Sequence, residues 1–481
     1  MIWSMDFPTL LKKLSFIWFT IMLLITAWSC NREKPLNPYP NIILVMADDM
    51  GWGDAGFQGN DTILTPNLDR LAGAGIRFNR FYAAAPVCSP TRGSCLTGRH
   101  PYRYGIYGAN VGKMKDAEIT LAEVVKTIGY RTGHFGKWHL GTFTNDEVDA
   151  NRGGRDPGVY APPWEHGFDV CFSTESKVPT YDPMVTPAPD AEDIGKREPG
   201  THFGTYYWTN PGEKVTDNLE GDDSRIIMDR VIPFVQSSIE KNQPFLSVIW
   251  FHTPHLPVIA GQKYKDLYSQ YDKDIQHFYG CITAMDEQIG RLVKEMKDLG
   301  ILDNTIIFFT SDNGPEGISR MGRKQGSAKR LRGRKRSLYE GGIRVPGLMI
   351  WPEKFQEPLV INSPVSTSDY YPTILDILNI QIPGQPLLDG ISLLPLLNGD
   401  RMVRSFPIGF QSGAQMAMID NKYKLYSSDN GESFALYDID NDPEESKDVS
   451  LDFPEIKDTL INQLNIWINS CKQSNEGYDY Q

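Results

Sequence analysis

Asn41-Ile-Ile-Leu-Val-Met-Ala47, followed directly by Asp48-Asp49, is the stretch that decides the fold of this sequence. The run 42–47 is apolar throughout and lacks the alternation of a strand with one solvent-exposed face. It therefore predicts a strand buried on both faces, as in a parallel sheet. Two carboxylates directly behind such a strand repel each other and lose hydration unless a cation holds them. A capping turn is the alternative explanation for this acidic pair.

Two more apolar runs have the same character, and polar residues follow each of them. Run 246–251 leads into His252-Thr-Pro-His255, and run 305–310 leads into Ser311-Asp312-Asn313-Gly314. The carboxyl ends of parallel strands lie at one edge of a sheet, where open α/β folds bind their ligands. Helical patterns alternate with these runs, and the one at 282–299 is amphipathic. We therefore predict an α/β fold with a large, mostly parallel central sheet and one site at its carboxyl edge.

A short helix is predicted over 90–97, because Ser89 is a good N-cap residue and Gly98 can end the helix. Cys88 then lies just outside the helix N-terminus, where unpaired N–H groups and the helix dipole favour negative charge. Arg92, in the first turn, adds a full positive charge at the same place. This arrangement suits a cysteine that faces an anion. A buried or metal-binding cysteine beside a tight turn is the alternative.

The sequence around this helix resembles the signature of the type I sulfatases, in which the cysteine is oxidised after synthesis to Cα-formylglycine. The matching residues are Cys88, Pro90, Arg92, Leu96, Thr97, Gly98 and Arg99. Further motifs of that family match at Gly136-Lys137-Trp-His139-Leu-Gly141, at Pro254-His255-Leu-Pro257 and between Lys335 and Pro346. The resemblance extends from Asn41 to about Cys471. It is closest to the arylsulfatase A-like and N-acetylgalactosamine-6-sulfatase branches.

The resemblance implies an alkaline-phosphatase-like α/β sandwich with a single bound calcium. The implied ligands are Asp48, Asp49, Asp312 and Asn313, together with an oxygen of modified residue 88 (Cys88). Carboxylate and amide oxygens are hard ligands that suit Ca²⁺ or Mg²⁺, and no Cys/His cluster has zinc-like spacing. Calcium would polarise the sulfate and favour the alkoxide form of the attacking hydroxyl.

The resemblance also implies roles for the catalytic groups. In the formylglycine hydrate one hydroxyl attacks sulfur, and the other can lose its proton and eject sulfate by reforming the aldehyde. His139 would take that proton, and His255 would donate one to the leaving alcohol as a general acid. The cations that would compensate charge on the sulfuryl oxygens are Arg92, Lys137 and Lys335.

Local patterns add predictions about the neighbours of these groups. Alternation in the segment 130–141 predicts a short strand with Lys137 and His139 on one side of it. His252 is expected to be a neighbour of the site, and Cys95, inside the predicted helix, is expected in the core. The irregular stretch 142–222 is expected to wall the substrate pocket, to which His166 or His202 could contribute.

Composition limits the partners of this chain of 481 residues. Its net charge of −12 argues against nucleic acid or an anionic membrane surface as the main partner. The implied partners are a sulfated carbohydrate substrate and a formylglycine-generating maturation enzyme. Of the six cysteines, four are left after Cys30 and Cys88 are assigned, and we expect no essential disulfide framework in a domain of this size.

The N-terminus predicts export. Lys12-Lys13 precede an apolar run from Leu14 to Trp28 that is shorter than a spanning helix, and Ser29-Cys30 follow. We predict a lipoprotein-type signal peptide over 1–29 with Cys30 lipidated, so that a lipid anchor is the only membrane contact. The expected location is the periplasm or the cell surface.

The remaining domain organisation is predicted from changes in pattern. A linker over 30–40 leads into a catalytic domain over 41–398, and a C-terminal subdomain follows over 399–481. Three alternating segments predict a small antiparallel sheet, and a helix follows them. The segments are Gln415–Ile419, Lys422–Tyr426 and Phe434–Tyr437, and the helix lies near Ile456–Ile468.

Two alternative functions remain open at this stage. A phosphate or phosphonate monoester hydrolase could use the same scaffold, because tetrahedral anions bind similarly. A non-catalytic lipoprotein could bind a sulfated glycan through the basic run Arg320–Arg336. The second alternative does not explain the intact Cys88 or the acidic pairs, because a binding protein has no need of a formylglycine precursor.

Overall fold

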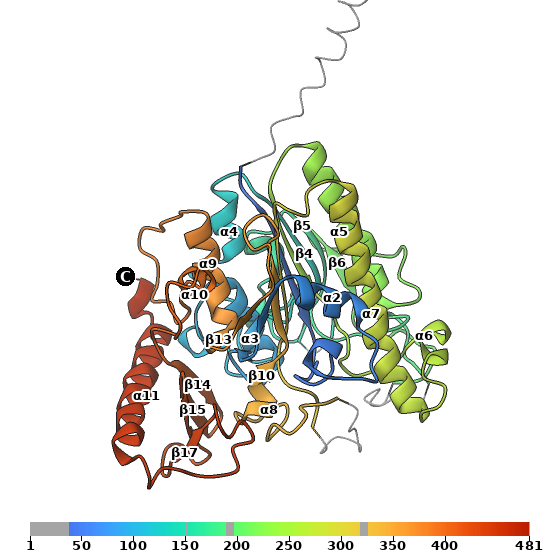
Figure 1. The fold of residues 1–481 in the computed structure, drawn as a ribbon. Helices are drawn as coiled ribbons and strands as arrows, with labels where there is room; N and C mark the ends of the chain where they lie inside the picture. The colour runs from blue at the N-terminus through green and yellow to red at the C-terminus, as the bar shows by residue number, and fades with distance from the viewer. Residues whose placement is uncertain (1–37, 151, 189–196, 318–325, 481) are drawn as a thin grey trace, which may run out of the picture. The chain divides into compact units, whose positions relative to one another are not determined.

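In the computed structural model, the run 42–47 belongs to strand β1 (Asn41–Ala47), which lies inside a ten-stranded sheet (Figure 1). In spatial order the strands are β12 (Leu359–Ile361), β2 (Ile76–Phe78), β11 (Gly347–Ile350), β9 (Thr305–Ser311), β1, β8 (Phe245–Trp250), β4 (Arg131–Lys137), β5 (Val170–Thr174), β6 (Tyr207–Thr209) and β7 (Glu213–Lys214). The five consecutive strands from β9 to β5 are parallel. The predicted buried parallel strands 246–251 and 305–310 are thus the two neighbours of β1.

The structure describes residues 38–150, 152–188, 197–317 and 326–480, and residues 39–481 form one compact unit. The predicted signal peptide, the predicted lipidation of Cys30 and most of the predicted linker lie outside the described residues. Within the described ranges, no helix has the length and apolar character needed to cross a membrane. All five cysteines of these ranges are buried free thiols.

Helices cover both faces of the central sheet, which gives the predicted α/β sandwich (Figure 1). One face packs against α3 (Cys88–Thr97), α4 (Leu121–Lys126), α9 (Tyr370–Ile377) and α10 (Leu394–Leu397). The other face packs against α2 (Pro66–Ala74), α5 (Asp223–Glu240) and α7 (Lys273–Asp298), and the short α6 (Gln262–Asp266) packs against α7. A small three-stranded sheet joins β10 (Arg344–Val345), β3 (Phe81–Tyr82) and β13 (Val365–Ser366), next to α8 (Glu340–Ile343).

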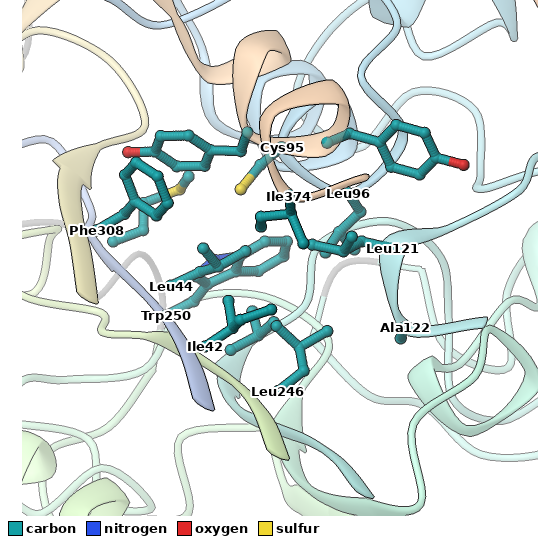
Figure 2. Close-up of a cluster of buried hydrophobic side chains, with 14 of the residues drawn as sticks. Ile42, Leu44, Cys95, Leu96, Leu121, Ala122, Leu246, Trp250, Phe308 and Ile374 are labelled. Carbon is teal, nitrogen blue, oxygen red and sulfur yellow. The ribbon is translucent and has the colours of Figure 1, made fainter. Parts of the chain in front are cut away.

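Apolar contacts fix α3 on the sheet. Figure 2 shows Cys95 and Leu96 of this helix above Leu44 of β1, Trp250 of β8 and Phe308 of β9. All five side chains are at most 1 % exposed. The prediction that Cys95 lies in the core is therefore correct. Because the C-terminal half of α3 is held in this way, its N-terminus is placed over the carboxyl ends of the strands.

The C-terminal part contains the predicted antiparallel sheet and helix. Its strands are β14 (Ile408–Ser412), β15 (Gln415–Asp420), β16 (Tyr423–Ser427) and β17 (Ala435–Asp438), and α11 (Pro454–Asn475) covers one face of them. Sequence patterns predict β15 to β17 but miss β14. The reason is Gly409, which replaces an apolar strand residue because a Cβ there would lie 2.4 Å from the Trp467 ring of α11.

A buried ion triad joins this small sheet to α8. Lys424 Nζ of β16 lies 3.0 Å from Glu340 Oε1 and 2.9 Å from Glu445 Oε1, and all three side chains are fully buried. Burial works against the charge of Lys424, but the two carboxylates outweigh it and raise its pKa. The triad therefore holds β16 and α8 in a fixed relation.

Replacement of Lys424 by Met should destabilise the protein strongly. Glu340 and Glu445 would lose their shared counter-charge while staying buried, which costs about 3–5 kcal/mol of unfolding free energy. Guanidinium unfolding followed by circular dichroism measures this loss. Lys447→Met, on an exposed lysine that pairs with Asp452, is the control and should leave the midpoint unchanged. An unchanged midpoint for Lys424→Met would contradict the importance of the triad.

Candidate active site

Polar residues from neighbouring strands meet at the carboxyl edge of the sheet. Ala47 at the end of β1 pairs with Ser311 at the end of β9, so Asp48 and Asp312 leave adjacent strands at the same level. The next residue, Asp49, has a φ of 69°, and its N–H donates to Asp312 Oδ1 at 3.1 Å. The structure thus gathers three carboxylates at the edge where the sequence predicts one site.

Each of these carboxylates is buried and forms its shortest ion pair with a different cationic side chain. The pairs are Lys137 Nζ with Asp48 Oδ2 at 2.6 Å, Arg92 Nη2 with Asp312 Oδ2 at 2.6 Å, and Lys335 Nζ with Asp49 Oδ1 at 2.5 Å. The cations come from β4, α3 and the loop before α8. Burying an ion without a partner costs several kcal/mol, so matched charges allow so many ions to lie together. Within this group of six, the charges cancel.

Arg92 is the most tightly held of the cations. It is fully buried, and its guanidinium also donates to the main-chain oxygen of Lys137 at 3.2 Å. The guanidinium lies over the Trp250 ring, 5.3 Å from the ring centre, and 3.5 Å from Asp48 Oδ2. These contacts fix the orientation of a charge that the sequence places only approximately.

The helix that carries Cys88 begins earlier than predicted. Helix α3 starts at Cys88 itself, Val87 is its N-cap residue, and no side chain caps it, so the expected start at Pro90 with Ser89 as the cap is wrong. Thr91 explains the difference, because its hydroxyl bonds the main chain of Ala85 and thereby ties the first turn to the preceding loop. The end at Gly98, with a φ of 70°, is as predicted.

Cys88 faces the acidic cluster. Its Sγ lies 3.5 Å from Asp48 Oδ1, and the residue is 1 % exposed. Burial, together with the charge of Asp312, raises the pKa of the Cys88 thiol. The thiolate is the nucleophilic form of cysteine, and this environment suppresses it. The unmodified side chain is therefore poorly suited to nucleophilic attack, although it lies at the centre of the site.

The donor set fits a hard divalent cation. Asp48, Asp49, Cys88 and His255 each offer an atom within 4.8 Å of the others. Asp49 Oδ2 and Asn313 Oδ1 are buried and have no hydrogen-bond partner among the described residues, and Asn313 Nδ2 donates to Asp49 Oδ1 at 2.7 Å. Burial and the nearby charge of Asp48 raise the pKa of Asp312 to about 7. The two unpartnered oxygens are of the hard type that Ca²⁺ or Mg²⁺ binds.

His139 reaches this region through a turn. Strand β4 ends at Lys137, so the predicted short strand runs into a loop as expected, and His139 lies in that loop with a φ of 60°, where strand alternation no longer sets its direction. His139 Nε2 lies 2.7 Å from Asn110 Oδ1 and donates to it, which leaves Nδ1 as a buried lone pair without a partner. Burial and the charges of Lys137 and Arg92 lower the pKa of His139. The ring is therefore neutral and offers a base at Nδ1.

The two histidines after β8 differ in their surroundings. His255 Nδ1 donates to the carbonyl of Leu256 at 2.7 Å, and its Nε2 lies 3.8 Å from Asp49 Oδ2. His252 is fully buried between Asp223, 2.8 Å from its Nδ1, and Thr174, 2.7 Å from its Nε2. His255 thus borders the acidic cluster, while His252 contacts Asp223 and Thr174 and holds the segment that follows β8.

Most other residues singled out from the sequence do not reach the cluster. His166 stacks on Trp138, and His202 stacks on Tyr206. The stretch 142–222, expected to be irregular, supplies strands β5 to β7. Of the basic run, Arg320, Arg323 and Lys324 lie outside the described residues. Five other members of the run bond to residues outside the cluster. The pairs are Lys329 with Gly59, Arg330 with Glu444, Arg332 with Glu445, Arg334 with Gly326, and Arg336 with Glu316. Among the described members of the run, Lys335 is the one that binds the cluster.

Sequence reasoning misses two supporting residues. Asn110 orients His139, but it lies in a loop with no motif around it. Glu316 lies 3.8 Å from Lys335 and 2.5 Å from Arg336. Its position close behind Asn313 is the signal that could have drawn attention to it.

Comparison with known proteins agrees with this geometry. The family model described as "Sulfatase" matches residues 40–380, and the model "N-sulphoglucosamine sulphohydrolase, C-terminal" matches residues 333–472. Mouse N-acetylgalactosamine-6-sulfatase is 32 % identical over 403 residues, which cover 80 % of this chain and 72 % of that protein. Rat steryl-sulfatase is 30 % identical over 418 residues, which cover 75 % and 71 %.

A solved structure shares the whole architecture. The complex of Ps i-CgsB with k-i-k-neocarrahexaose superposes with a TM-score of 0.76 at 26 % identity and covers 92 % of this chain and 97 % of that one. The family model spans well over half of the chain, and both relatives reach the identity and coverage at which family membership holds. This chain therefore belongs to the sulfatase family, whose members are sulfuric ester hydrolases of the alkaline-phosphatase-like superfamily.

Proposed function

We propose that this sulfatase removes sulfate from a carbohydrate, with Cys88 converted to formylglycine and with one calcium ion at the acidic cluster. The observation that carries the proposal is the neutral group of three carboxylates and three cations around a buried residue 88. A divalent cation adds two positive charges to this group and a sulfate monoester adds one negative charge, so the two together leave less net charge than the cation alone.

The conversion of Cys88 is supported by its surroundings and by the matching signature. When Cys88 is converted, residue 88 supplies an aldehyde hydrate, which is a nucleophile that can also release the group it has taken up. The buried thiol lacks this ability, and its raised pKa keeps it protonated. A formylglycine-generating maturation enzyme is therefore a proposed partner of the chain.

The acidic residues would hold the metal. Asp48, Asp49, Asp312 and Asn313 supply oxygen ligands, and oxygen-rich sets of this kind favour Ca²⁺ or Mg²⁺. When bound, calcium would supply positive charge that polarises the sulfate ester. The cations that would stabilise negative charge on the sulfuryl oxygens are Arg92, Lys137 and Lys335.

The two histidines would divide the proton transfers. His139 would accept a proton at Nδ1, because Asn110 already receives its Nε2–H. His255 would deliver a proton from Nε2 to the leaving alcohol, because its Nδ1–H is held by Leu256. Burial lowers the pKa of His255, so it has to gain a proton before it can act as an acid. A bound sulfate ester favours this gain through its negative charge.

A sugar is the proposed leaving group for two reasons. A relative that is 32 % identical to this chain is named N-acetylgalactosamine-6-sulfatase, and solved neighbours include a complex with the disulfated sugar D-glucosamine-2-N,6-O-disulfate. The predicted export with a lipid anchor also suits an enzyme that acts on external glycans. Steryl-sulfatases belong to the same set of relatives, so a steroid sulfate is the matched alternative substrate for a direct comparison. No observation favours phosphate esters or a purely binding function.

Conversion of Cys88 should be visible in one tryptic peptide. Cleavage after Arg80 and Arg92 yields Phe81–Arg92, which contains Cys88 as its only cysteine. Mass spectrometry of active protein should find an aldehyde in place of the thiol. Cys88→Ala should lower activity by roughly 10⁴ or more, because the nucleophile is lost. Cys95→Ala, on the same helix but in the core, is the control and should keep both the modification and the activity. Full activity with an unmodified Cys88 would refute the proposal.

Asp312→Asn should remove metal and activity together. The substitution keeps the shape of the side chain but removes one of the three negative charges that attract the cation. Elemental analysis should find about one calcium per chain in the wild-type protein and a loss of bound calcium in the variant. Asp389→Ala breaks a buried ion pair with Arg103 away from the cluster. This control should lose stability and retain calcium. Stoichiometric calcium in Asp312→Asn would show that the assigned ligands are wrong.

His255→Ala should separate the two proton transfers. A sugar alkoxide is a poor leaving group, whereas 4-nitrophenolate leaves almost without help. The rate on a sulfated sugar should therefore fall by about 10²-fold or more, and the rate on 4-nitrophenyl sulfate far less. His139→Ala should lower both rates alike, because it acts on the step that both substrates share. Equal losses on the two substrates for His255→Ala would mean that this histidine only binds sulfate.

A further inference from the structure

A cavity lies along the same edge of the sheet as the candidate active site. Its volume is about 900 Å³, and it contains none of the residues assigned to catalysis or metal binding. Its lining includes residues at the carboxyl ends of β2 and β12, where Phe78 pairs with Ile361. Strand β2 is separated from β1 by β11 and β9. Three strand spacings place the end of β2 about 14 Å from the end of β1.

The cavity concentrates positive charge in a chain whose net charge is −12. Its charged lining residues are the cations Arg77, Arg80, Arg344 and Lys422 and one carboxylate, Asp440. Arg80 and Arg344 are each 9 % exposed. Arg80 is held by Asp440 at 2.7 Å, Arg344 lies 3.5 Å from Glu340, and Lys422 lies 3.3 Å from Asp438 outside the cavity lining. The lining is thus built from fixed charges.

Arg77 is the cation that these pairs leave unbalanced. Among the described residues, no carboxylate oxygen lies within ion-pair distance of its guanidinium. Within the described residues, its hydrogen bond goes from Nη1 to the main-chain oxygen of Phe57 at 3.4 Å, and its buried Nε has no partner there. A guanidinium in this state is suited to bind a sulfate group through two of its N–H groups.

The remaining lining suits a sugar. Trp52 is half-buried, its ring faces the guanidinium of Arg344 at 5.2 Å, and its indole N–H has no hydrogen-bond partner. The amide side chains of Asn79 and Asn421 also line the cavity. Aromatic faces with a few convergent polar groups are the usual composition of small-molecule sites. Trp52 also follows Asp49 by three residues, so one loop contributes to both sites.

We propose that this cavity binds a sulfated segment of a carbohydrate chain, with a sulfate on Arg77 and a sugar ring beside Trp52. A second sulfate of the same chain then occupies the site at residue 88, so the protein holds a polymeric substrate at two points. The proposal rests on the proposed carbohydrate substrate. Holding a chain at a second point raises the local concentration of its other sulfates without any new contact at the catalytic group.

Arg77→Gln tests the proposal in two settings. In a Cys88→Ala background, affinity electrophoresis measures binding to chondroitin sulfate, heparin and ι-carrageenan, with desulfated chondroitin beside them. At least one sulfated polymer should retard the protein, and Arg77→Gln should weaken this binding about tenfold, the loss of one charge-assisted interaction. With Cys88 intact, the rate on 4-nitrophenyl sulfate should stay unchanged while kcat/KM on the polymer falls. Arg70→Gln, at an exposed position of α2 outside the cavity, is the matched control. It should change neither the polymer binding nor the kcat/KM on the polymer.

Three results would overturn the second site. The first is equal polymer binding by the protein with Arg77 and by Arg77→Gln. The second is binding of desulfated chondroitin as strong as that of chondroitin sulfate. The third is displacement of the polymer by inorganic sulfate at the molar concentration of the polymer's own sulfate groups. A failure of the proposed function looks different. If the enzyme cleaves steroid sulfates and no sulfated sugar, yet binds sulfated polymers through Arg77, the substrate proposal falls and the second site stands.

Discussion

The structure depends on the mutual neutralisation of buried charges at the carboxyl edge of one parallel sheet. Two adjacent apolar strands deliver three carboxylates to one place, and this is possible only because three cations reach them from other parts of the fold. No pair in this group is independent, since Arg92 lies within 3.5 Å of Asp48 as well as bonding Asp312. Removing one charge therefore disturbs every other member. The site is costly to bury and is correspondingly specific in what it can bind.

Packing far from the chemistry supplies the precision of this site. Helix α3 has an apolar half that rests on β1, β8 and β9, and a polar first turn that carries residue 88 and Arg92 (Figure 2). A buried interior is close-packed, so a helix anchored in this way cannot shift its N-terminus freely. The ten residues of α3 therefore both pack the core and position residue 88 and Arg92.

The same sheet edge explains how one fold can hold a polymer. Strands β2 and β12 end at the edge where β1 and β9 end, because β11 reverses direction between them. Two sites built on one rigid sheet keep a fixed separation. A flexible chain with charged groups at intervals can satisfy both, and a small sulfate ester can satisfy one.

The sequence by itself determines the buried parallel strands, the acidic residues after them, the signature around Cys88 and the antiparallel character of β15 to β17. These features are local, because hydrophobic runs, turn residues and motifs are written in consecutive positions. Tertiary structure alone decides which charges pair. Lys335 meets Asp49 across 286 positions and Arg92 meets Asp312 across 220, and no local pattern encodes such distances. It also decides that α3 starts at Cys88, that a turn follows β4 at His139, and that Arg77 has no counter-ion in the part of the chain that the structure describes. Each of these outcomes follows from packing between distant segments, which overrides the preference of any single stretch of chain.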